Sequence, residues 1–404
     1  MPVEIAKSPN EKNDTLQPII HLRKMLHRHP ELSGQETGTA ERIREFFTAN
    51  HPTELITKIG GHGLAAVYNF SNEGPVVVVR CELDALPIAE TNPFEHRSLV
   101  PGVSHKCGHD GHMAIVAGLS TWIKKKDFKK GSIVLLFQPA EETGEGAFAV
   151  LNSSLFKNIQ PDYFFALHNL PGEEMHTIIV VNDFFSASVQ SVCISLKGKQ
   201  SHASEPEKGI NPAMTISNII NALAQLNVTD ETKENFALLT PVHLLMGEKA
   251  YGISAGTGEL HYTLRTWTDK QMEELKKNLS NIVTNLCRKQ SLEYDISWFD
   301  YFPASANQPA CNELVRKAAT GNGFLVKERP IPFKFGEDFG WYSKHYPAAM
   351  FGIGAGLHSP ALHHQDYDFP DEIIGTGISM FYGIIEQLLG QGGTSMGTGG
   401  RTSK

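Results

Sequence analysis

The sequence predicts an α/β protein, in which a mostly parallel sheet forms a catalytic domain that carries an inserted, ferredoxin-like α+β satellite domain. Before residue 183 and after residue 301, short apolar runs alternate with helical patterns, which is typical of a parallel sheet covered on both faces. Between them the expected order is strand, helix, strand, strand, helix, strand, as in the ferredoxin-like motif. At 404 residues the chain is long enough for two cores.

The catalytic domain is expected to be formed by two stretches of the chain, one before and one after the inserted domain. Apolar residues spaced three and four apart predict helices, and continuous apolar runs predict buried strands. The helices are expected at 16–28, 37–50, 113–125, 310–321 and 372–389, and the strands at 63–70, 76–81, 132–138, 163–168 and 348–354.

The inserted domain is expected to contain strands at 188–198, 236–245, 259–267 and 292–299, and helices at 209–227 and 269–290. The domain limits that follow are 1–183 and 301–390 for the catalytic domain and 184–300 for the satellite. The Gly/Ser/Thr-rich stretch 391–404 is expected to be a disordered tail.

Composition narrows the class of protein. A net charge of −8 argues against a nucleic-acid or anionic-membrane partner. The apolar runs are strand-sized, far short of a membrane span, and the N-terminus has no apolar segment of signal-peptide length. The five scattered cysteines form no disulfide framework, so a reducing, cytoplasmic setting is expected.

Side chains that could bind a metal or take part in catalysis follow several of the expected strands. Open parallel sheets bind ligands at the carboxyl ends of their strands, so these side chains are expected to converge. They are Glu82 and Asp84 in "RCELDALP", Cys107 and His109 in "HKCGHDGH", Glu141 and Glu142 in "FQPAEE", His168 in "ALHNLPG", and His363 and His364 in "ALHHQDYDFPDE".

A mixed set of thiolate, imidazole and carboxylate ligands suits zinc, manganese, cobalt or nickel. Five ligands exceed what one tetrahedral ion needs, so two ions sharing a ligand are expected. Two ions about 3.5–4 Å apart can polarise a carbonyl and hold a hydroxide. Of the adjacent glutamates, one would bind metal and the other would take the proton of the water.

Each residue alone has a simpler interpretation. A lone histidine is more often a hydrogen-bonded structural residue, paired glutamates often begin solvated helices, and Cys107 could be a small buried hydrophobe. His27 and His29 are interpreted as loop or capping residues, and His358 ranks below His363 as a ligand. The metal hypothesis depends on the coincidence of all five ligands at strand ends.

These stretches resemble the amidohydrolases that include hippurate hydrolase, bacterial N-acyl-amino-acid deacylases and plant auxin-conjugate hydrolases, within the wider aminoacylase and carboxypeptidase G group of metallopeptidases. The resemblance covers nearly the whole chain. It includes, in the order of the family, "LRKMLHRHPELSGQE", "LDALP", "HKCGHDGH", "FQPAEE", "LHNLPG", "GKQSHAS", "GEDF" and "LHHQDYDFPDE".

The resemblance implies a zinc-peptidase-like catalytic domain and a role for each matching residue. Glu141 would be the general base and Asp84 would orient a ligand. His202 would stabilise the oxyanion, often in the partner subunit's site, and Arg265 would bind the carboxylate of the substrate. The implied metal ligands are Cys107, His109, Glu142, His168 and His363, the last chosen for its place four residues before "YDF".

The implied activity is hydrolysis of N-acyl amino acids or related small amides, with a homodimer formed through the satellite domain. Two alternatives remain: a carboxypeptidase or dipeptidase acting on short peptides, and a catalytically silent metal-binding relative. The sequence departs from the family at Glu82, at Gln200-Ser201 and at His364-Gln365. None of these departures removes an expected ligand, but they leave the acyl and amino-acid preference open.

Overall fold

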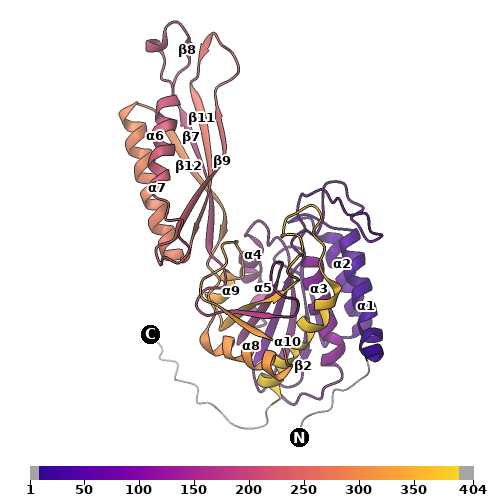
Figure 1. Cartoon of the computed structure of the whole chain (residues 1–404). Helices are drawn as coiled ribbons and strands as arrows, with labels where there is room; N and C mark the ends of the chain where they lie inside the picture. Colours follow the sequence, from indigo (N-terminus) through magenta and orange to yellow (C-terminus); the bar gives the residue numbers. More distant parts are fainter. Residues whose placement is uncertain (1–8, 391–404) are drawn as a thin grey trace.

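The computed structural model describes the backbone of residues 9–390 and the side chains of residues 16–390. Figure 1 shows two units, a larger one containing both ends of this range and a satellite that extends away from it. The stretch 391–404, expected to be a disordered tail, lies outside the described residues.

The larger unit is built on an eight-stranded sheet of order β1-β2-β4-β3-β5-β14-β6-β13. Its centre is parallel, because β3 pairs in parallel with β4 and β5, and β5 pairs in parallel with β14. Antiparallel pairs appear toward both sides, where β2 meets β1 and β4, and where β6 meets β14. The strands are β1 (Glu54–Ile59), β2 (Gly63–Asn69), β3 (Val76–Glu82), β4 (Ser132–Gln138), β5 (Tyr163–Leu170), β6 (Ile178–Val181), β13 (Val326–Arg329) and β14 (Ala348–Gly354).

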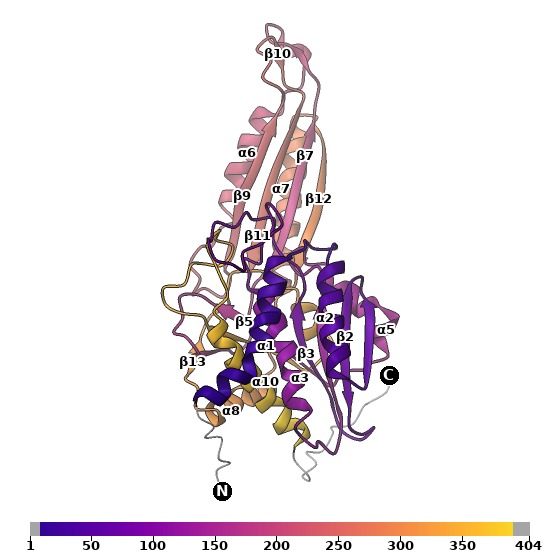
Figure 2. The same cartoon turned by 90° about the vertical axis from the view of Figure 1, so that its right-hand side faces the viewer.

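Helices cover both faces of this sheet, which explains its continuous apolar strands. Successive side chains of β3 enter opposite cores, with Val77 and Val79 on one side and Val78 on the other. Figure 2 shows α1, α2, α3 and α10 in front of the sheet. The first face carries α1 (Pro9–Arg28), α2 (Thr37–Asn50), α3 (His109–Ile123), α8 (Pro309–Gly321) and α10 (Ile374–Leu389), and the second carries α4 (Gly146–Asn152), α5 (Ser154–Lys157) and α9 (Gly340–Ser343).

The satellite is a four-stranded antiparallel sheet of order β12-β7-β11-β9 with two helices on one face (Figure 1). A capping box between Thr268 and Gln271 fixes the start of α7. The short pair β8/β10 lies at the far tip. The elements are β7 (Ser188–Lys197), β8 (Ser201–His202), α6 (Ala213–Ala224), β9 (Ala237–Met246), β10 (Ile253–Ser254), β11 (Thr257–Thr266), α7 (Asp269–Lys289) and β12 (Glu293–Phe302), and 3-10 turns occur at Pro206–Lys208 and Asp371–Ile373.

The predicted fold class is confirmed: the larger sheet is mostly parallel at its centre, and the satellite has the ferredoxin-like order of elements. The domain limits 1–183, 184–300 and 301–390 stay a prediction. Across residues 9–390, none of the helices combines the length and the apolar character needed to cross a bilayer.

Candidate metal centre and active site

The five expected metal ligands converge at one edge of the larger sheet. Ligand atoms of Cys107, His109 and His168 lie within 4.8 Å of one another, and so do those of Cys107, Glu142 and His363. The Sγ of Cys107 is 3.6 Å from Nε2 of His168. Cys107 therefore belongs to two overlapping groups, as expected for a ligand placed between two ions.

Two carboxylates lie beside one histidine. Nε2 of His109 is 3.8 Å from Oε1 of Glu142 and 3.9 Å from Oε2 of Glu141. Ligand atoms of these three residues also lie within 4.8 Å of one another. Glu141 is 5% exposed, so it sits inside the protein at the edge of the cluster rather than on a solvated helix start.

The ligand histidines are oriented by their second ring nitrogen. Nδ1 of His109 donates to the carbonyl of Asp84 at 2.9 Å, and Nδ1 of His168 donates to the carbonyl of Asn169 at 2.8 Å. A carbonyl can only accept, so the proton of each neutral ring is on Nδ1. The lone pair on each Nε2 is then available to the cluster.

Two buried acceptors at the centre have no hydrogen-bond partner within the described part of the chain: Nε2 of His109 and Oε1 of Glu142. Leaving such atoms unpaired costs about 1–3 kcal/mol each, so buried acceptors of this kind normally have a partner. A divalent cation would satisfy both of them, and the S, N and O donors are those that zinc-class ions prefer. The residues present thus fit the expected metals.

Local backbone geometry explains how neighbouring residues become ligands. Gly108 separates Cys107 from His109 with φ of 94°, and a Cβ there would lie 2.8 Å from the side-chain amide of Asn169. His363 itself has φ of 65°, and its N–H donates to the carbonyl of Lys106 at 2.8 Å. This bond fastens the C-terminal segment beside the loop that carries the thiol.

The loop that carries Glu141 and Glu142, here called the glutamate loop, is held in a similar way. Ala140, directly before Glu141, has φ of 51°, and its N–H donates to Oε1 of Glu36 at 2.7 Å. Oδ2 of Asp84 accepts from the N–H of Glu142 at 2.9 Å and from Oγ of Ser33 at 2.7 Å. Non-glycine residues in the left-handed region are uncommon and concentrate at functional sites.

Burial sets the protonation of the metal-free ligands. It raises the pKa of the Cys107 thiol well above its usual value, and it raises the pKa of Glu142 to about 7 against the opposing effect of His109. Burial, followed by the charges of Glu337 and Glu142, raises the pKa of Glu141. A bound divalent cation acts in the opposite direction on thiols and carboxylates.

Sequence reasoning missed a buried ion network beneath the cluster. The guanidinium of Arg80, inside the apolar strand β3, pairs with Glu82, with Glu337 at 3.0 Å and with Asp338 at 2.6 Å. Asp338 in turn accepts from the N–H of Ala147 at 2.8 Å, just after the glutamate loop. The available signal was the pair of charged residues, Arg80 and Glu82, at the end of the apolar run "VVVVRCE".

His112 belongs to the same sequence motif as His109 but has a different role. Its Nδ1 lies 2.7 Å from Oε2 of Glu82, and its Nε2 lies 2.6 Å from Oδ1 of Asn169. Both ring nitrogens are therefore occupied. Although Glu82, His109 and His112 are close enough to form a metal group, the first is already paired with Arg80.

The interpretation of His27 as a loop or capping residue is wrong. It lies in the last turn of α1, is fully buried, and bridges Oδ2 of Asp110 at 2.9 Å and Oε1 of Glu90 at 3.0 Å. Burial disfavours its charged form, but Asp110 and Glu90 outweigh burial and raise the pKa of His27 to about 9. This histidine therefore lies on the inward face of α1 and not in a loop.

His202 and Arg265 lie on the satellite. His202 is exposed on β8 at the tip, with Nδ1 2.6 Å from Oγ of Ser204, and Figure 1 places this tip far from the larger unit. Arg265, near the base of the satellite, donates from Nε to the carbonyl of Lys334 at 2.9 Å. Phe335, which follows Lys334, packs its ring 5.2 Å from that of His168.

The fold and the donor cluster together define a class of protein, a two-unit α/β chain in which Cys, His and Glu side chains gather at one edge of the larger sheet. The model of the peptidase family M20/M25/M40 matches residues 78–387, and the chain belongs to this family. With the donor cluster, this membership makes the chain a metal-dependent amidohydrolase or peptidase.

The chain is similar over most of its length to proteins of known name. An N-acetyl-L-cysteine deacetylase of Bacillus subtilis is 30% identical over 377 residues, covering 92% of this chain and 88% of the relative. An N-acetylcysteine deacetylase of the same organism is 27% identical over 365 residues, covering 90% and 94%. A solved structure from Bacillus subtilis, described as a dinuclear metal binding peptidase from the M20 family, matches with a TM-score of 0.79 at 25% identity and covers 94% and 99%.

Proposed function

We propose that this chain hydrolyses the amide bond of N-acyl amino acids or related small amide conjugates, releasing a carboxylic acid and a free amino acid. Two divalent ions, of zinc, manganese, cobalt or nickel, would be held by Cys107, His109, Glu142, His168 and His363. The observation that carries this proposal is the pair of carboxylates of Glu141 and Glu142, both within 4 Å of Nε2 of His109.

The two glutamates are assigned different roles, metal binding for Glu142 and proton transfer for Glu141. Glu142 shares a ligand group with Cys107 and His363, and Glu141, whose carboxylate lies beside that of Glu142 at His109, is assigned as general base. When bound, the ions supply Lewis-acid polarisation of the scissile carbonyl and acidify water. Glu141 accepts a proton from the attacking water and delivers it to the departing amine nitrogen, a role that suits a carboxyl whose pKa is raised by burial.

Other residues position these groups. Asp84 orients His109 through its carbonyl and the glutamate loop through its carboxylate, as residues behind metal ligands commonly do. Arg265 is assigned to the carboxylate of the substrate, because it lies near the base of the satellite beside the segment that packs on His168.

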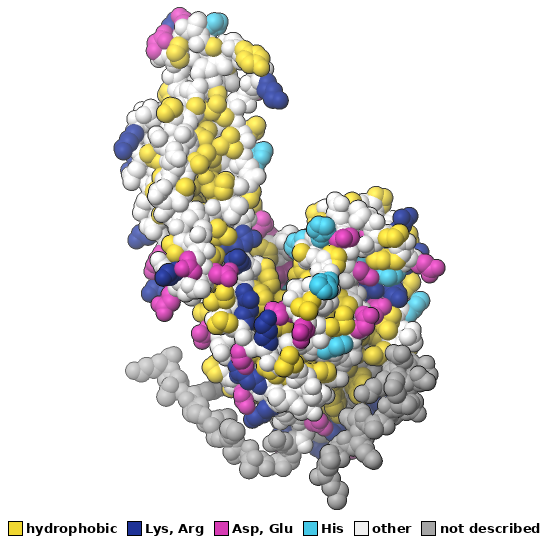
Figure 3. All heavy atoms as spheres, viewed as in Figure 1, with side chains coloured by type: hydrophobic (Ala, Val, Ile, Leu, Met, Phe, Trp, Pro, Cys, Tyr) yellow, Lys and Arg dark blue, Asp and Glu magenta, His cyan; other side chains and the backbone are white. Residues whose placement is uncertain are grey.

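His202 is assigned to the oxyanion in the active site of a partner subunit. It is exposed at the tip of the satellite, away from the cluster of its own chain (Figure 1). A second copy would pair along β9, an edge strand on which the seven residues 240–246 are all exposed. Figure 3 shows hydrophobic side chains in a band along the satellite, and Val242, Leu244 and Leu245 are among the exposed ones.

The acyl-amino-acid substrate class is supported by the names of the two deacetylase relatives, both of which describe removal of an acyl group from cysteine. The specific acyl group and amino acid are left to experiment. Short peptides are the second candidate, because the similar solved structure is described as a peptidase.

A substrate panel tests this choice. The purified chain, stripped of metal and refilled separately with manganese, zinc, cobalt or nickel, is offered N-acetyl amino acids, hippurate and dipeptides. We expect the acyl amino acids to give the highest kcat/KM. Dipeptides as better substrates would overturn the substrate class while leaving the hydrolase assignment intact.

The roles of the glutamates are tested by a matched pair of variants. Glu141→Gln should lower kcat by about 10²–10⁴-fold, the usual contribution of a general base, with metal content unchanged. Glu142→Gln should lose bound metal as well as activity. Metal loss in Glu141→Gln would show that the two roles are assigned the wrong way round.

A further inference from the structure

The satellite sheet has one open face, opposite the face covered by α6 and α7. On it, three side chains form a row across neighbouring strands. Cys193 on β7 is the register partner of His261 on β11, and His261 is the register partner of His243 on β9. Directly opposed residues of antiparallel strands have Cβ atoms about 4.5–5.5 Å apart, so the sheet itself brings these donors together.

A carboxylate completes the group. Glu259 lies two residues before His261 on β11 and therefore on the same face. Sγ of Cys193 is 3.5 Å from Nε2 of His261, and Nε2 of His261 is 3.6 Å from Oε2 of Glu259. All three ligand atoms lie within 4.8 Å of one another.

These separations match a tetrahedral ion. Zinc bonds of about 2.3 Å to sulfur and about 2.0–2.1 Å to nitrogen or oxygen, at tetrahedral angles, place the ligand atoms about 3.3–3.6 Å apart. The distances from Nε2 of His261 to Sγ of Cys193 and to Oε2 of Glu259, 3.5 and 3.6 Å, lie within this range. The remaining distance, between Sγ of Cys193 and Oε2 of Glu259, can reach this range by a small rotation of the Glu259 side chain, which is 47% exposed.

We propose that Cys193, Glu259 and His261 form a second metal site, specific for a borderline divalent ion such as zinc, cobalt or nickel and separate from the catalytic cluster. The thiolate and the carboxylate together balance the charge of the ion. Sulfur and imidazole donors disfavour magnesium and calcium, which take oxygen ligands. His243, whose ring centroid is 5.3 Å from that of His261, supplies the fourth ligand.

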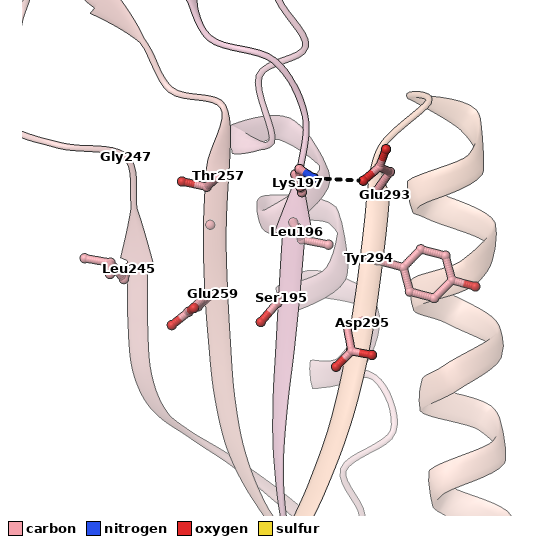
Figure 4. Close-up of a pocket in the computed structure, with 11 residues that line it drawn as sticks. Ser195, Leu196, Lys197, Leu245, Gly247, Thr257, Glu259, Glu293, Tyr294 and Asp295 are labelled. Atoms are coloured by element: carbon pink, nitrogen blue, oxygen red, sulfur yellow. Dashed lines mark ion pairs between the residues drawn. The ribbon is translucent and has the colours of Figure 1, made fainter.

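The site is open to solvent from the uncovered face. Figure 4 shows Glu259 and Ser195 projecting from neighbouring strands toward the same side, while Leu196 points away from them. Glu259 and Ser195 line a shallow pocket with Leu245 and Asp295. An ion can reach the group without opening a core, and once bound it ties β7 to β11 and to the edge strand β9.

Cobalt(II) added to the metal-free full chain tests the proposal, because a thiolate ligand gives a near-ultraviolet charge-transfer band. The catalytic thiol is first removed with Cys107→Ser, so that any band that remains comes from another thiol. We expect this protein to keep a cobalt–thiolate band. Adding Cys193→Ser should abolish the band, and adding His261→Gln should raise the cobalt concentration needed to form it.

Cys287→Ala is the matched control, since it removes a buried thiol of the same satellite that faces the α7 core. It should leave the band intact. In the otherwise unaltered chain, native mass spectrometry should find one ion fewer in Cys193→Ser than in the wild type, with amide hydrolysis retained. Absence of the cobalt–thiolate band in Cys107→Ser would overturn the second site, and so would equal ion counts in Cys193→Ser and the wild type. Neither result would affect the catalytic assignment.

Discussion

Nε2 of His109 and Oε1 of Glu142 face each other at 3.8 Å, and neither has a hydrogen-bond partner within residues 16–390. A proton on the imidazole or a metal ion between these two atoms offsets the repulsion of their lone pairs. In the proposed centre, metal binding replaces such a proton with two coordinate bonds. The thermodynamic consequences of this contact can be measured without a substrate.

Metal removal should destabilise the chain. An ion that binds only the native state adds about 2.7 kcal/mol when its concentration is 100 times its Kd. Thermal unfolding followed by circular dichroism should show a lower Tm after chelation, restored by manganese or zinc. Glu142→Gln, which lacks one donor, should show a smaller difference, and an unchanged Tm in the wild type would count against the metal centre.

Replacing Arg80 should be among the most damaging substitutions. Arg80→Met leaves the buried carboxylates of Glu82, Glu337 and Asp338 without their cation. Breaking a buried pair costs about 3–5 kcal/mol, so urea unfolding should shift to a clearly lower midpoint. Arg316→Met is the control, because Arg316 pairs with the half-exposed Glu328, and such pairs contribute at most about 1 kcal/mol.

His27 should make stability fall as the pH rises. Its pKa is raised from 6.5 to about 9 in the folded chain, so its contribution is fully present below pH 6.5 and is lost as the pH passes through about 9. The free energy of unfolding of the wild type minus that of His27→Gln should therefore shrink across this window, by about 2–3 kcal/mol. A difference independent of pH would show that His27 is not charged in the native state.

Mixing two inactive variants tests where His202 acts. A dimer of one Glu141→Gln chain and one His202→Ala chain contains one intact site if His202 serves the partner, because both defects then fall in the other site. Random re-pairing should restore about a quarter of wild-type activity in a symmetric dimer. If His202 serves its own chain, each site carries one defect and the mixture stays inactive.

Much of this architecture could be predicted from the sequence. Glu142 and His168 lie at the ends of expected strands, and the carboxyl ends of parallel strands share one edge, so their convergence could be expected from the sequence. Cys107 and His109 precede the expected helix 113–125, and the choice of His363 came from the family resemblance. The ion pairs of Arg80 with Glu337 and Asp338, and those of His27, could not be predicted, because these partners lie far along the chain. The row formed by Cys193, His261 and His243 depends on strand register, which period-two patterns alone do not specify.

The hydrogen bond from the N–H of His363 to the carbonyl of Lys106 joins a late segment of the chain to an early one. With His363 as a proposed ligand, a nascent polypeptide cannot complete this centre until residue 363 has emerged from the ribosome. Capture of the full complement of ions is consequently a late event in biogenesis, and it reports that the C-terminal strand and helix have docked.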